Sequence, residues 1–434
     1  MRSYIFEDVL RRVLELNSFK VEHIMNITDV GHLTSDADTG EDKLLKGAER
    51  EKKTVWEVAD FYTKAFKNDI KELNLLFPKV FPKATEHIKE QIELIKKLEK
   101  KGFIYQAGGN VYFDTSKLKD YGKLARLNLE EDGEKARARV EKDINKKNPY
   151  DFVLWFTKSK FDEQEMKWDS PFGMGYPGWH LECSAMSMKY LGEQFDIHCG
   201  GIDHIPVHHT NEIAQSEAAT GKKPWVKYWL HNEFLVLKKG EKMAKSGDNF
   251  VTLSTLKEKG FVALDYRYFC LGTVYRKPLM FDYEALESAK TAREKLVERV
   301  LDLKEEVKIG KGKLNPEKFS GVARRYQDLF LEQVSDDLNT PQALATMWDL
   351  LKDSTVKDNE KLCLLYYFDQ VFGLGLENVK EEKIPAEILK LAKEREKARQ
   401  TKDWATSDKL RDELTKKGYS VDDQKEGFKV RKIK

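Results

Sequence analysis

Three residues near the middle of the chain combine the side-chain types that zinc binds best. Cys183 offers a thiol, His208 an imidazole and Glu212 a carboxylate, and these groups are the usual zinc ligands of proteins. His208 and Glu212 are spaced i, i+4, so on a helix their side chains share one face and can hold one ion. The spacing therefore predicts a metal site. The same stretch contains four rival ligands that spacing does not exclude: His198, Cys199, His204 and His209.

A glycine turn lies between the candidate ligands. The segment Phe195–Gly201 has the composition of a buried strand that runs into this turn, and open α/β sheets bind ligands at the carboxyl ends of their strands. Gly200 and Gly201 let the backbone approach a ligand, and Asp203 can accept hydrogen bonds from ribose hydroxyls. Alone this motif is weak, but beside a metal site it predicts nucleotide binding.

A lysine-rich loop follows this region. Lys242 and Lys245 stand three residues apart between Gly240 and Gly247. Each ammonium is a point charge on a flexible stem, so the pair could close over a polyphosphate. A solvated basic loop is the alternative, and composition alone favours that alternative.

The bulk composition is that of a soluble protein of two or three domains. The chain has 434 residues, of which 40% are hydrophobic and 35% charged. Its 76 Lys and Arg residues nearly cancel its 74 Asp and Glu residues, so any RNA contact must depend on local patches. Four scattered cysteines favour a reducing compartment. Because no apolar run is long enough to cross a bilayer, we expect a cytoplasmic protein that makes no membrane contact.

Hydrophobic periodicity predicts an α/β protein that becomes helical towards its carboxyl end. The amino-terminal part is expected to contain a helix, then a strand, then two helices, over residues 3–16, 21–28, 58–73 and 85–101. A mostly β insertion is expected over 103–170 and a strand–helix–strand section over 172–237. From 286 the pattern is helical nearly to the end, with breaks near 308–315 and 375–385.

Three motifs in this order closely resemble cysteinyl-tRNA synthetase, a class I aminoacyl-tRNA synthetase. They are Pro177–Met186, the segment from Gly200 through Glu212 to Ser216, and the Lys-Met-Ala-Lys-Ser loop at 242–246. In the family this loop normally reads Lys-Met-Ser-Lys-Ser, so Ala244 is a departure. Further matching stretches cover essentially the whole chain: Asn26–Asp29, Pro82–Thr85, Tyr112–Asp114, Asn148–Phe152, Asp337–Pro341, Lys402–Ala405 and Asp408–Leu414.

The resemblance implies a role for each candidate residue. Cys183, His208 and Glu212 become ligands of one zinc ion, and His209 becomes a neighbour of that site. Trp179 is placed against the amino-acid side chain. The remaining assignments concern ATP: Asp203, with Gly200 and Gly201, lies near the adenylate ribose, and the catalytic lysine Lys245 binds the phosphates with Lys242 assisting. Cys199 stands where the family has glycine, and we interpret it as a structural residue.

The implied function is the ATP-dependent ligation of L-cysteine to tRNA(Cys) through a cysteinyl adenylate. ATP would act as a substrate with Mg²⁺, and the enzyme would be a monomer. Zinc would select the substrate thiolate. Cysteine differs from serine by one atom, and a hydrophobic pocket distinguishes two such similar amino acids only about a hundredfold. Zinc distinguishes them better, because thiolate is a far better zinc ligand than a hydroxyl.

The resemblance also predicts the domain organisation. A Rossmann-type parallel-sheet catalytic domain over 1–237 would carry a connective insertion at about 103–170, and 238–285 would hold the lysine loop and contact the tRNA stem. A helical tRNA-binding bundle over 286–376 would precede a small anticodon-recognition domain over 377–434. In that last domain the candidate RNA contacts are Trp404, Tyr419, Phe428 and Arg431. For each aromatic residue, a place in the hydrophobic core of the domain is at least as good an explanation.

The start of the chain departs from the family pattern. In the family, a strand with a Cys-Gly-Pro-Thr type sequence and a His-Ile-Gly-His signature precedes the helix that opens here, and Met1–Tyr4 corresponds to the residues just after it. The fourth zinc ligand, the signature histidines and the central strand are then expected upstream of Met1. We interpret Met1 as an internal methionine or a fragment boundary, with a genuinely truncated protein as the alternative.

Two other functions remain open at this point. A non-catalytic, truncated tRNA-binding paralogue would fail at cysteine-dependent ATP–pyrophosphate exchange and still bind tRNA, which is what we expect of this chain alone. A cysteine:amino-sugar ligase of the same superfamily would share the zinc site and the lysine loop. That enzyme lacks the helical part that this chain carries from 286 to 434, which disfavours it.

Overall fold

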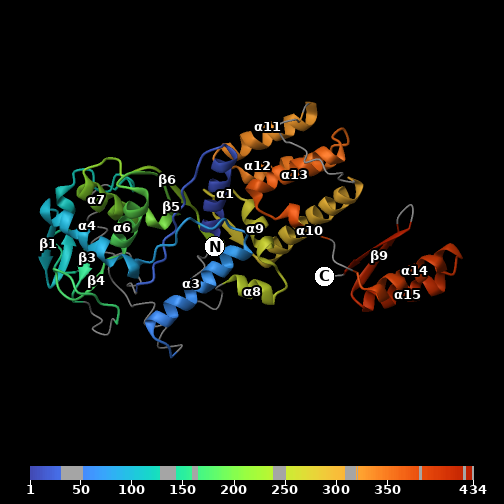
Figure 1. The fold of residues 1–434 in the computed structure, drawn as a ribbon, viewed down its shortest axis with the longest axis horizontal. Helices are drawn as coiled ribbons and strands as arrows, with labels where there is room; N and C mark the ends of the chain where they lie inside the picture. The colour runs from blue at the N-terminus through green and yellow to red at the C-terminus, as the bar shows by residue number, and fades with distance from the viewer. Residues whose placement is uncertain are drawn as a thin grey trace. The chain divides into compact units, whose positions relative to one another are not determined.

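The computed structural model describes residues 1–30, 52–127, 143–158, 165–237, 251–307, 319, 321–380, 384–423 and 427–432. The chain divides into two compact units, Met1–Glu377 and Asn378–Lys434 (Figure 1). The first unit mixes helices with parallel and antiparallel strands, which confirms the predicted α/β class. None of the helices in the described ranges is long and apolar enough to cross a membrane.

A four-stranded antiparallel sheet occupies part of the first unit. It consists of β1 (Ile104–Ala107), β2 (Asn110–Phe113), β3 (Phe152–Phe156) and β4 (Tyr176–Pro177), in that order. The first two strands form a hairpin through Gly108 and Gly109, which both have positive φ, as tight hairpin turns require. The short 3-10 helix η2 (Thr115–Lys117) follows β2.

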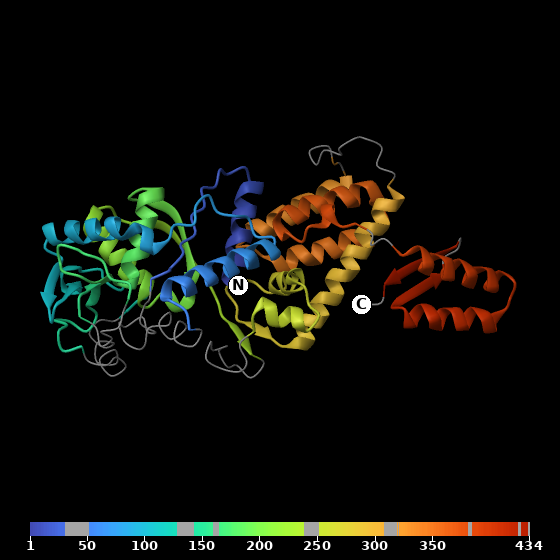
Figure 2. The same ribbon diagram turned by 60° about the horizontal axis from the view of Figure 1, so that its bottom comes forward.

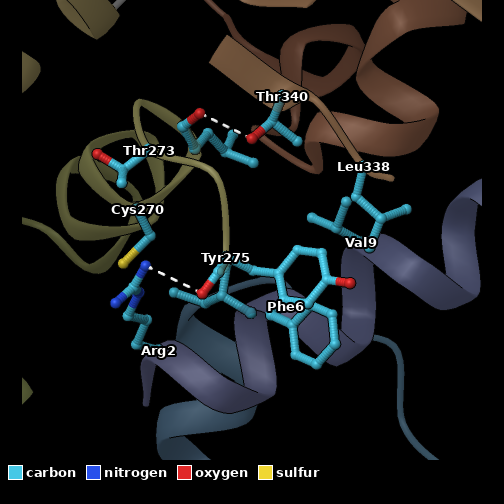
Figure 3. A pocket seen from close by; sticks show the side chains of 10 residues that line it. Arg2, Phe6, Val9, Cys270, Thr273, Tyr275, Leu338 and Thr340 are labelled. Carbon is cyan, nitrogen blue, oxygen red and sulfur yellow. Dashed lines mark hydrogen bonds between the residues drawn. The ribbon is translucent and has the colours of Figure 1, made fainter. Parts of the chain in front are cut away.

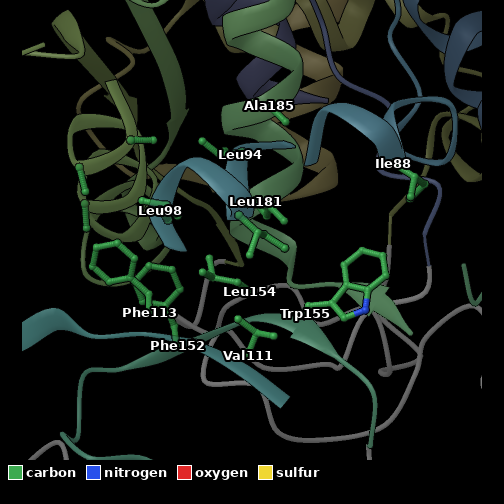
Figure 4. Close-up of a cluster of buried hydrophobic side chains, with 14 of the residues drawn as sticks. Ile88, Leu94, Leu98, Val111, Phe113, Phe152, Leu154, Trp155, Leu181 and Ala185 are labelled. Atoms are coloured by element: carbon green, nitrogen blue, oxygen red, sulfur yellow. The ribbon is translucent and has the colours of Figure 1, made fainter. Parts of the chain in front are cut away.

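Helices cover one face of this sheet and form a large core cluster with it. They are α4 (Ile88–Lys100), α6 (Trp179–Leu191) and α7 (His208–Thr220). Figure 4 shows leucines of α4 and α6 directed at the apolar side chains of β2 and β3. A second cluster, Tyr112, Val153, Phe156 and Tyr176, belongs to the same strands, so β3 is buried along its whole length.

Two parallel strand pairs make up the rest of the described sheet structure in this unit. β5 (Phe195–Gly201) pairs with β6 (Val226–Asn232), and α7 lies between them in the chain. The short 3-10 helix η3 (Ile202–His204) follows β5 and leads into α7. β7 (Leu235–Leu237) pairs with β8 (Leu279–Phe281). The expected strand–helix–strand section over 172–237 is therefore present.

The amino-terminal region corrects one prediction. α1 (Arg2–Leu16), α3 (Val55–Glu72) and η1 (Ala84–His87) form as helices, but the predicted strand at 21–28 makes only two isolated parallel bridges, Ile24 to Val80 and Ile27 to Lys83. The segment is extended, and the N–H groups of Met25 and Ile27 donate to the carbonyl oxygens of Val80 and Pro82. These few bonds do not continue into a strand ladder.

A helical region completes the first unit (Figure 2). It contains α8 (Leu253–Glu258), α9 (Ala263–Leu271), α10 (Tyr283–Glu306), α11 (Gly321–Ser335), α12 (Thr340–Lys352), α13 (Asp358–Phe372) and the 3-10 helix η5 (Leu376–Asn378). Phe330 of α11 stacks on Phe368 of α13 with ring centroids 4.1 Å apart, and both are fully buried.

The buried ion pair between Asp8 and Arg267 joins the amino-terminal helix to this helical region. Asp8 Oδ2 lies 2.6 Å from Arg267 Nη2, and both side chains are buried. The guanidinium also donates to the carbonyl oxygens of Leu73 and Phe372, so one cation holds the ends of α3 and α13 as well. A Cβ on Gly373 would come within 2.4 Å of this guanidinium, which explains the glycine there.

A second buried arginine connects the segment before β7 with the segment between α9 and β8. Arg2 donates to the carbonyl oxygens of Glu233 and Phe234 and to those of Val274, Tyr275 and Lys277. Figure 3 shows Arg2 and Phe6 of α1 beside Cys270 and Tyr275, around a small pocket between α1 and the end of α9. The rings of Phe6 and Tyr275 stack at 4.3 Å.

The second unit is a helical hairpin followed by a β-hairpin. α14 (Ala386–Gln400) and α15 (Trp404–Lys416) pack against each other, and β9 (Tyr419–Asp423) pairs antiparallel with β10 (Phe428–Lys432). Ile388, Ala392, Leu414 and Val421 form its buried core. The expectation of helix nearly to the end was wrong, because the alternating pattern after Gly418 forms strands.

Breaking the Asp8–Arg267 pair should destabilise the first unit strongly. In Arg267→Met the Asp8 carboxylate stays buried without its main partner, and such losses typically cost about 3–5 kcal/mol. The free energy of unfolding, measured by denaturant titration, checks this. Arg324→Met is the matched control, because Arg324 pairs with Asp328 on the surface and should cost at most about 0.5 kcal/mol. Equal losses in the two variants would contradict the role of the buried pair.

Candidate metal and nucleotide site

The three predicted metal ligands come together between α6 and α7. Cys183 lies on α6, His208 and Glu212 lie on the first turns of α7, and the two helices pack against each other. One ligand atom from each residue lies within 4.8 Å of the other two. As the i, i+4 spacing predicted, His208 and Glu212 share one face of the helix, and His208 Nε2 lies 2.9 Å from Glu212 Oε1.

Local sequence explains why α6 reaches this position. α6 starts after Gly178, where a Cβ would lie 2.0 Å from the carbonyl oxygen of Val153. Glycine therefore allows the chain to pass close over β3 before the helix begins. α7 ends at Gly221 in the left-handed conformation, a common helix stop.

Glu212 shows that the ligand set fits a metal ion. Its side chain is fully buried, its oxygens lie 2.9 Å from His208 Nε2 and 3.2 Å from His198 Nε2, and the Cys183 thiol also contacts the carboxylate. Burial raises the pKa of Glu212, against the lowering effect of His198, His204 and Cys183. A buried carboxylate without a cationic partner is costly, and a divalent cation held by Cys183, His208 and Glu212 would offset that cost.

The thiol of Cys183 lies in the same low-dielectric surroundings. Burial, with the carboxylates of Glu212 and Glu182 nearby, raises the pKa of Cys183 well above its ordinary value. Without a cation the thiol is therefore protonated at neutral pH. A coordinated metal ion deprotonates a thiol outright, so a metal would convert Cys183 and Glu212 into a pair of anionic ligands.

His180 takes a role that spacing did not indicate. Its Nδ1 lies 2.9 Å from Nδ1 of His208, so it can fix the orientation of the His208 ring, as outer contacts do for metal-ligating histidines. Gln215 of α7 donates to the carbonyl oxygen of His180 and to Ser184 Oγ. The sequence could have indicated this role, because His180 precedes Cys183 by one helical turn and so lies on the same face of α6.

Further histidines surround the ligand set. His198 Nε2 lies 3.2 Å from Glu212 Oε2, and His209 Nδ1 lies 2.8 Å from His231 Nε2. Burial lowers the pKa of His198, lowers that of His209 well below its ordinary value and lowers that of His231 to about 4. These three imidazoles are therefore neutral at pH 7. The structure also groups His198 and His209 with Glu212 as converging ligand atoms.

The remaining rivals from the sequence are His204, whose ring centroid lies 5.1 Å from those of His208 and His209, and Cys199 on β5. In the described ranges, neither His204 nor Cys199 belongs to a set of converging ligand atoms. Burial raises the pKa of the Cys199 thiol well above its ordinary value, which is consistent with an unreactive side chain on β5.

The structure places Trp179 beside the candidate metal ligands. Its ring centroid lies 4.4 Å from that of His208 and 6.1 Å from that of His204. Trp179 is the first residue of α6 and is only partly buried. The structure therefore places Trp179 next to the predicted ligand His208.

The glycine turn lies at the carboxyl ends of two parallel strands. Gly200 and Gly201 of β5 are paired with the end of β6, where α/β sheets bind ligands. A Cβ on Gly200 would come within 2.6 Å of the His209 ring, and one on Gly201 within 2.3 Å of Asp203 Oδ1. Asp203 is exposed on η3. The turn therefore connects the histidine cluster with the candidate nucleotide-binding residues.

The lysine loop lies outside the described residues, so Lys242 and Lys245 remain predictions. The elements on either side of the loop are described. β7 ends at Leu237, and α8 is capped by Thr252, which accepts from the backbone N–H of Thr255.

Comparison with known proteins identifies the class. Residues 1–291 match the family model for the class I (C) tRNA synthetase catalytic domain. Two solved synthetases share the fold: Mycobacterium tuberculosis methionyl-tRNA synthetase bound by methionyl-adenylate, and the Agrobacterium radiobacter K84 agnB2 LeuRS in complex with tRNA and LeuAMS. The first has a TM-score of 0.56 at 18% identity and covers 86% of each chain. The second has a TM-score of 0.58 at 11% identity and covers 88% of this chain and 83% of that one. The fold is that of a class I aminoacyl-tRNA synthetase.

Sequence comparison then gives the family. Residues 381–431 match the cysteinyl-tRNA ligase anticodon binding domain. The cysteine–tRNA ligase of Treponema denticola is 50% identical over 98% of this chain and 90% of its own length. That of Borrelia hermsii is 44% identical over 100% of this chain and 92% of its own length. The chain belongs to the cysteine–tRNA ligase family, which confirms the resemblance found in the sequence and the predicted charging of tRNA with cysteine.

The contact between His180 and His208 yields a prediction about metal affinity. In His180→Phe the ring remains in its cavity but no longer binds His208 Nδ1, and loss of such an outer contact typically weakens metal binding about 10–100-fold. Competition with a chromogenic chelator measures the affinity. His87→Phe is the control, because His87 is equally buried and binds Lys83 and Tyr190 instead. Unchanged affinity in His180→Phe would exclude the orienting role.

Proposed function

We propose that this chain carries the cysteine-activating site of its family, with zinc bound by Cys183, His208 and Glu212. In the proposed reaction L-cysteine and ATP form cysteinyl adenylate, and the cysteinyl group passes to tRNA(Cys). The observation that carries the proposal is the fully buried Glu212 carboxylate, whose ligand atom converges with the thiol of Cys183 and the imidazole of His208. When bound, zinc would supply a selective ligand position for the substrate thiolate.

The chain's own residues would position the substrates around this site. Trp179 lies against His208 and would limit the space next to the amino-acid side chain. Asp203, on the exposed side of the glycine turn, would accept hydrogen bonds from the adenylate ribose, while Gly200 and Gly201 allow the nucleotide to approach the backbone. His180 would hold the His208 ring in its ligating orientation.

The charged groups that act on ATP would come from the lysine loop. Lys245 is proposed to bind the phosphates with Lys242 assisting, and Mg²⁺ would accompany ATP. Activation depends on positioning and on stabilising developing charge, which two ammonium groups supply when the loop closes. Arg2 would maintain the segments before and after the loop in a fixed arrangement through their carbonyl oxygens.

Recognition of tRNA is proposed to involve the helical part of the chain. The region 238–285 would contact the acceptor stem, 286–376 would form a tRNA-binding bundle, and 377–434 would read the anticodon. In the second unit Trp404 is 56% exposed, and the Arg399 guanidinium lies 5.8 Å from its ring centroid. An exposed aromatic beside a guanidinium is suited to stack on an unpaired base. We also propose that the enzyme acts as a monomer in the cytoplasm.

The zinc proposal predicts a thiol-specific response that does not depend on catalysis. In the Co²⁺-substituted protein, Cys183 should give a sulfur-to-cobalt charge-transfer absorption, and L-cysteine should increase it by adding a second thiolate. L-serine should leave the spectrum unchanged, because a hydroxyl is a poor ligand beside a thiolate. Cys183→Ser should lose the absorption, whereas Cys363→Ser, a change at a cysteine of α13, should retain it. An equal response to serine and cysteine would refute the selective role of the metal.

The anticodon proposal predicts a loss of tRNA affinity on truncating Trp404. Stacking of a base on an aromatic side chain is worth about 1–3 kcal/mol, so Trp404→Ala should weaken binding of tRNA(Cys) roughly 5- to 150-fold in a filter-binding titration. Leu389→Ala serves as the control, because Leu389 is an exposed apolar residue on α14 of the same unit. If both variants bind like the unmodified chain, Trp404 makes no such contact.

A further inference from the structure

Three large aromatic side chains are exposed within one short stretch of α3. Trp56, Phe61 and Tyr62 are 48%, 50% and 47% exposed. The rings of Phe61 and Tyr62 lie edge to face with centroids 5.3 Å apart, and Nζ of Lys53 lies 4.7 Å from the centroid of the Phe61 ring. Large apolar groups gathered on a surface mark an interaction site. Residues 53–62 are called the aromatic segment of α3 below.

The charges around the aromatic segment favour an anionic partner. The Glu57 carboxylate already accepts from the backbone N–H and the hydroxyl of Thr54 at the helix cap. Asp60 pairs with Lys64, and both Lys53 and Lys64 are exposed. Lysine is depleted from the cores of protein–protein interfaces, because burying an ammonium is costly. A partner for this segment should therefore combine flat apolar surfaces with negative charge, and a single-stranded nucleic acid has both.

The start of α3 packs next to the elements that carry the candidate metal ligands. The rings of Trp56 and Trp168 lie edge to face, with centroids 6.3 Å apart. Trp168 also packs against a core cluster at the start of α3 and against the cluster that contains Met186 of α6. Its backbone exchanges two hydrogen bonds with Gly175, and the chain from Gly175 to Trp179 spans at most about 14 Å. The aromatic segment is thus connected directly to the start of α6.

The other end of α3 reaches the helical region. Glu72, the last residue of α3, pairs with Lys257 of α8 (Figure 1), and α8 belongs to the region 238–285 that is proposed to contact the acceptor stem. α3 therefore extends between that region and the start of α6. The 3′ end of a tRNA is single-stranded and has to pass from the stem to the adenylate, so α3 borders its path.

We propose that the aromatic segment of α3 binds the unpaired 3′ nucleotides of the tRNA, whose bases would stack on Trp56 and Phe61. This proposal rests on the proposed function, because a tRNA 3′ end is brought here only if the chain charges tRNA. Lys53 and Lys64 would contact the phosphates between these bases. Stacking on an aromatic ring tolerates any base, so this surface would hold the 3′ end in place without reading its sequence.

Binding of two RNAs tests the proposal: intact tRNA(Cys), and the same tRNA without its unpaired 3′ nucleotides. The unmodified chain should bind the intact RNA more tightly. Trp56→Ala should weaken binding of the intact RNA roughly 5- to 150-fold, the effect of one stacked base, and leave binding of the shortened RNA unchanged. Trp56→Phe keeps a ring and should retain most of the affinity. Tyr228→Ala, a change at an exposed aromatic of β6, is the control and should bind both RNAs like the unmodified chain.

Three results would overturn the proposal alone. They are equal affinity of the unmodified chain for the two RNAs, an equal loss for both RNAs in Trp56→Ala, and a dimer in sedimentation velocity that Trp56→Ala dissociates. In the last case a second copy of the chain covers the segment. The cobalt absorption and the Trp404→Ala titration test the proposed zinc site and anticodon contact separately. Failure of the unmodified chain to bind either RNA would overturn the proposed tRNA recognition as a whole and this proposal with it, so the two failures are distinguishable.

Discussion

The structure depends above all on a carboxylate that is buried without a permanent cation beside it. Glu212 is inaccessible to solvent, and its oxygens meet the imidazoles of His208 and His198 and the thiol of Cys183. Burying such a charge costs several kcal/mol unless a counter-charge accompanies it. A divalent cation is the counter-charge that suits these neighbours, and it explains why Cys183 and His208 converge on the same point. The packing of α6 on α7 and the contact of the His180 ring with His208 both hold these ligands close together.

A second buried charge holds the surroundings of the site together. The Asp8–Arg267 pair connects α1, the end of α3, α9 and the end of α13, and these segments come from widely separated parts of the sequence. Arg2, on the same helix as Asp8, binds the carbonyl oxygens of Phe234, just before β7, and of Lys277, just before β8. α1 therefore connects the helical region, through Asp8, to the segment that leads through β7 into the lysine loop. Because both arginines are satisfied by specific partners, they favour one arrangement of these elements.

Sequence patterns predicted part of this arrangement and missed the rest for physical reasons. The i, i+4 pair of α7 and the helical periodicity of α1 and α3 are local features, so they could be read directly. The extended segment at 21–28 was mistaken for a strand because a strand also needs continuous pairing, and its partner lies some fifty residues away in the sequence. His180 was not assigned a role and His198 was only one of four rival ligands, since their contacts come from atoms on another helix or strand. The ion pair of Asp8 with Arg267 spans too much sequence for any local pattern to predict.

The most direct test of the metal at Glu212 is X-ray absorption spectroscopy of the zinc-loaded protein. The structure predicts one sulfur neighbour from Cys183 at about 2.3 Å, with nitrogen and oxygen neighbours at about 2.0–2.2 Å from His208 and Glu212. Addition of L-cysteine should raise the sulfur contribution, and addition of L-serine should not. A zinc spectrum with only nitrogen and oxygen neighbours, unchanged by cysteine, would contradict the central role of this site.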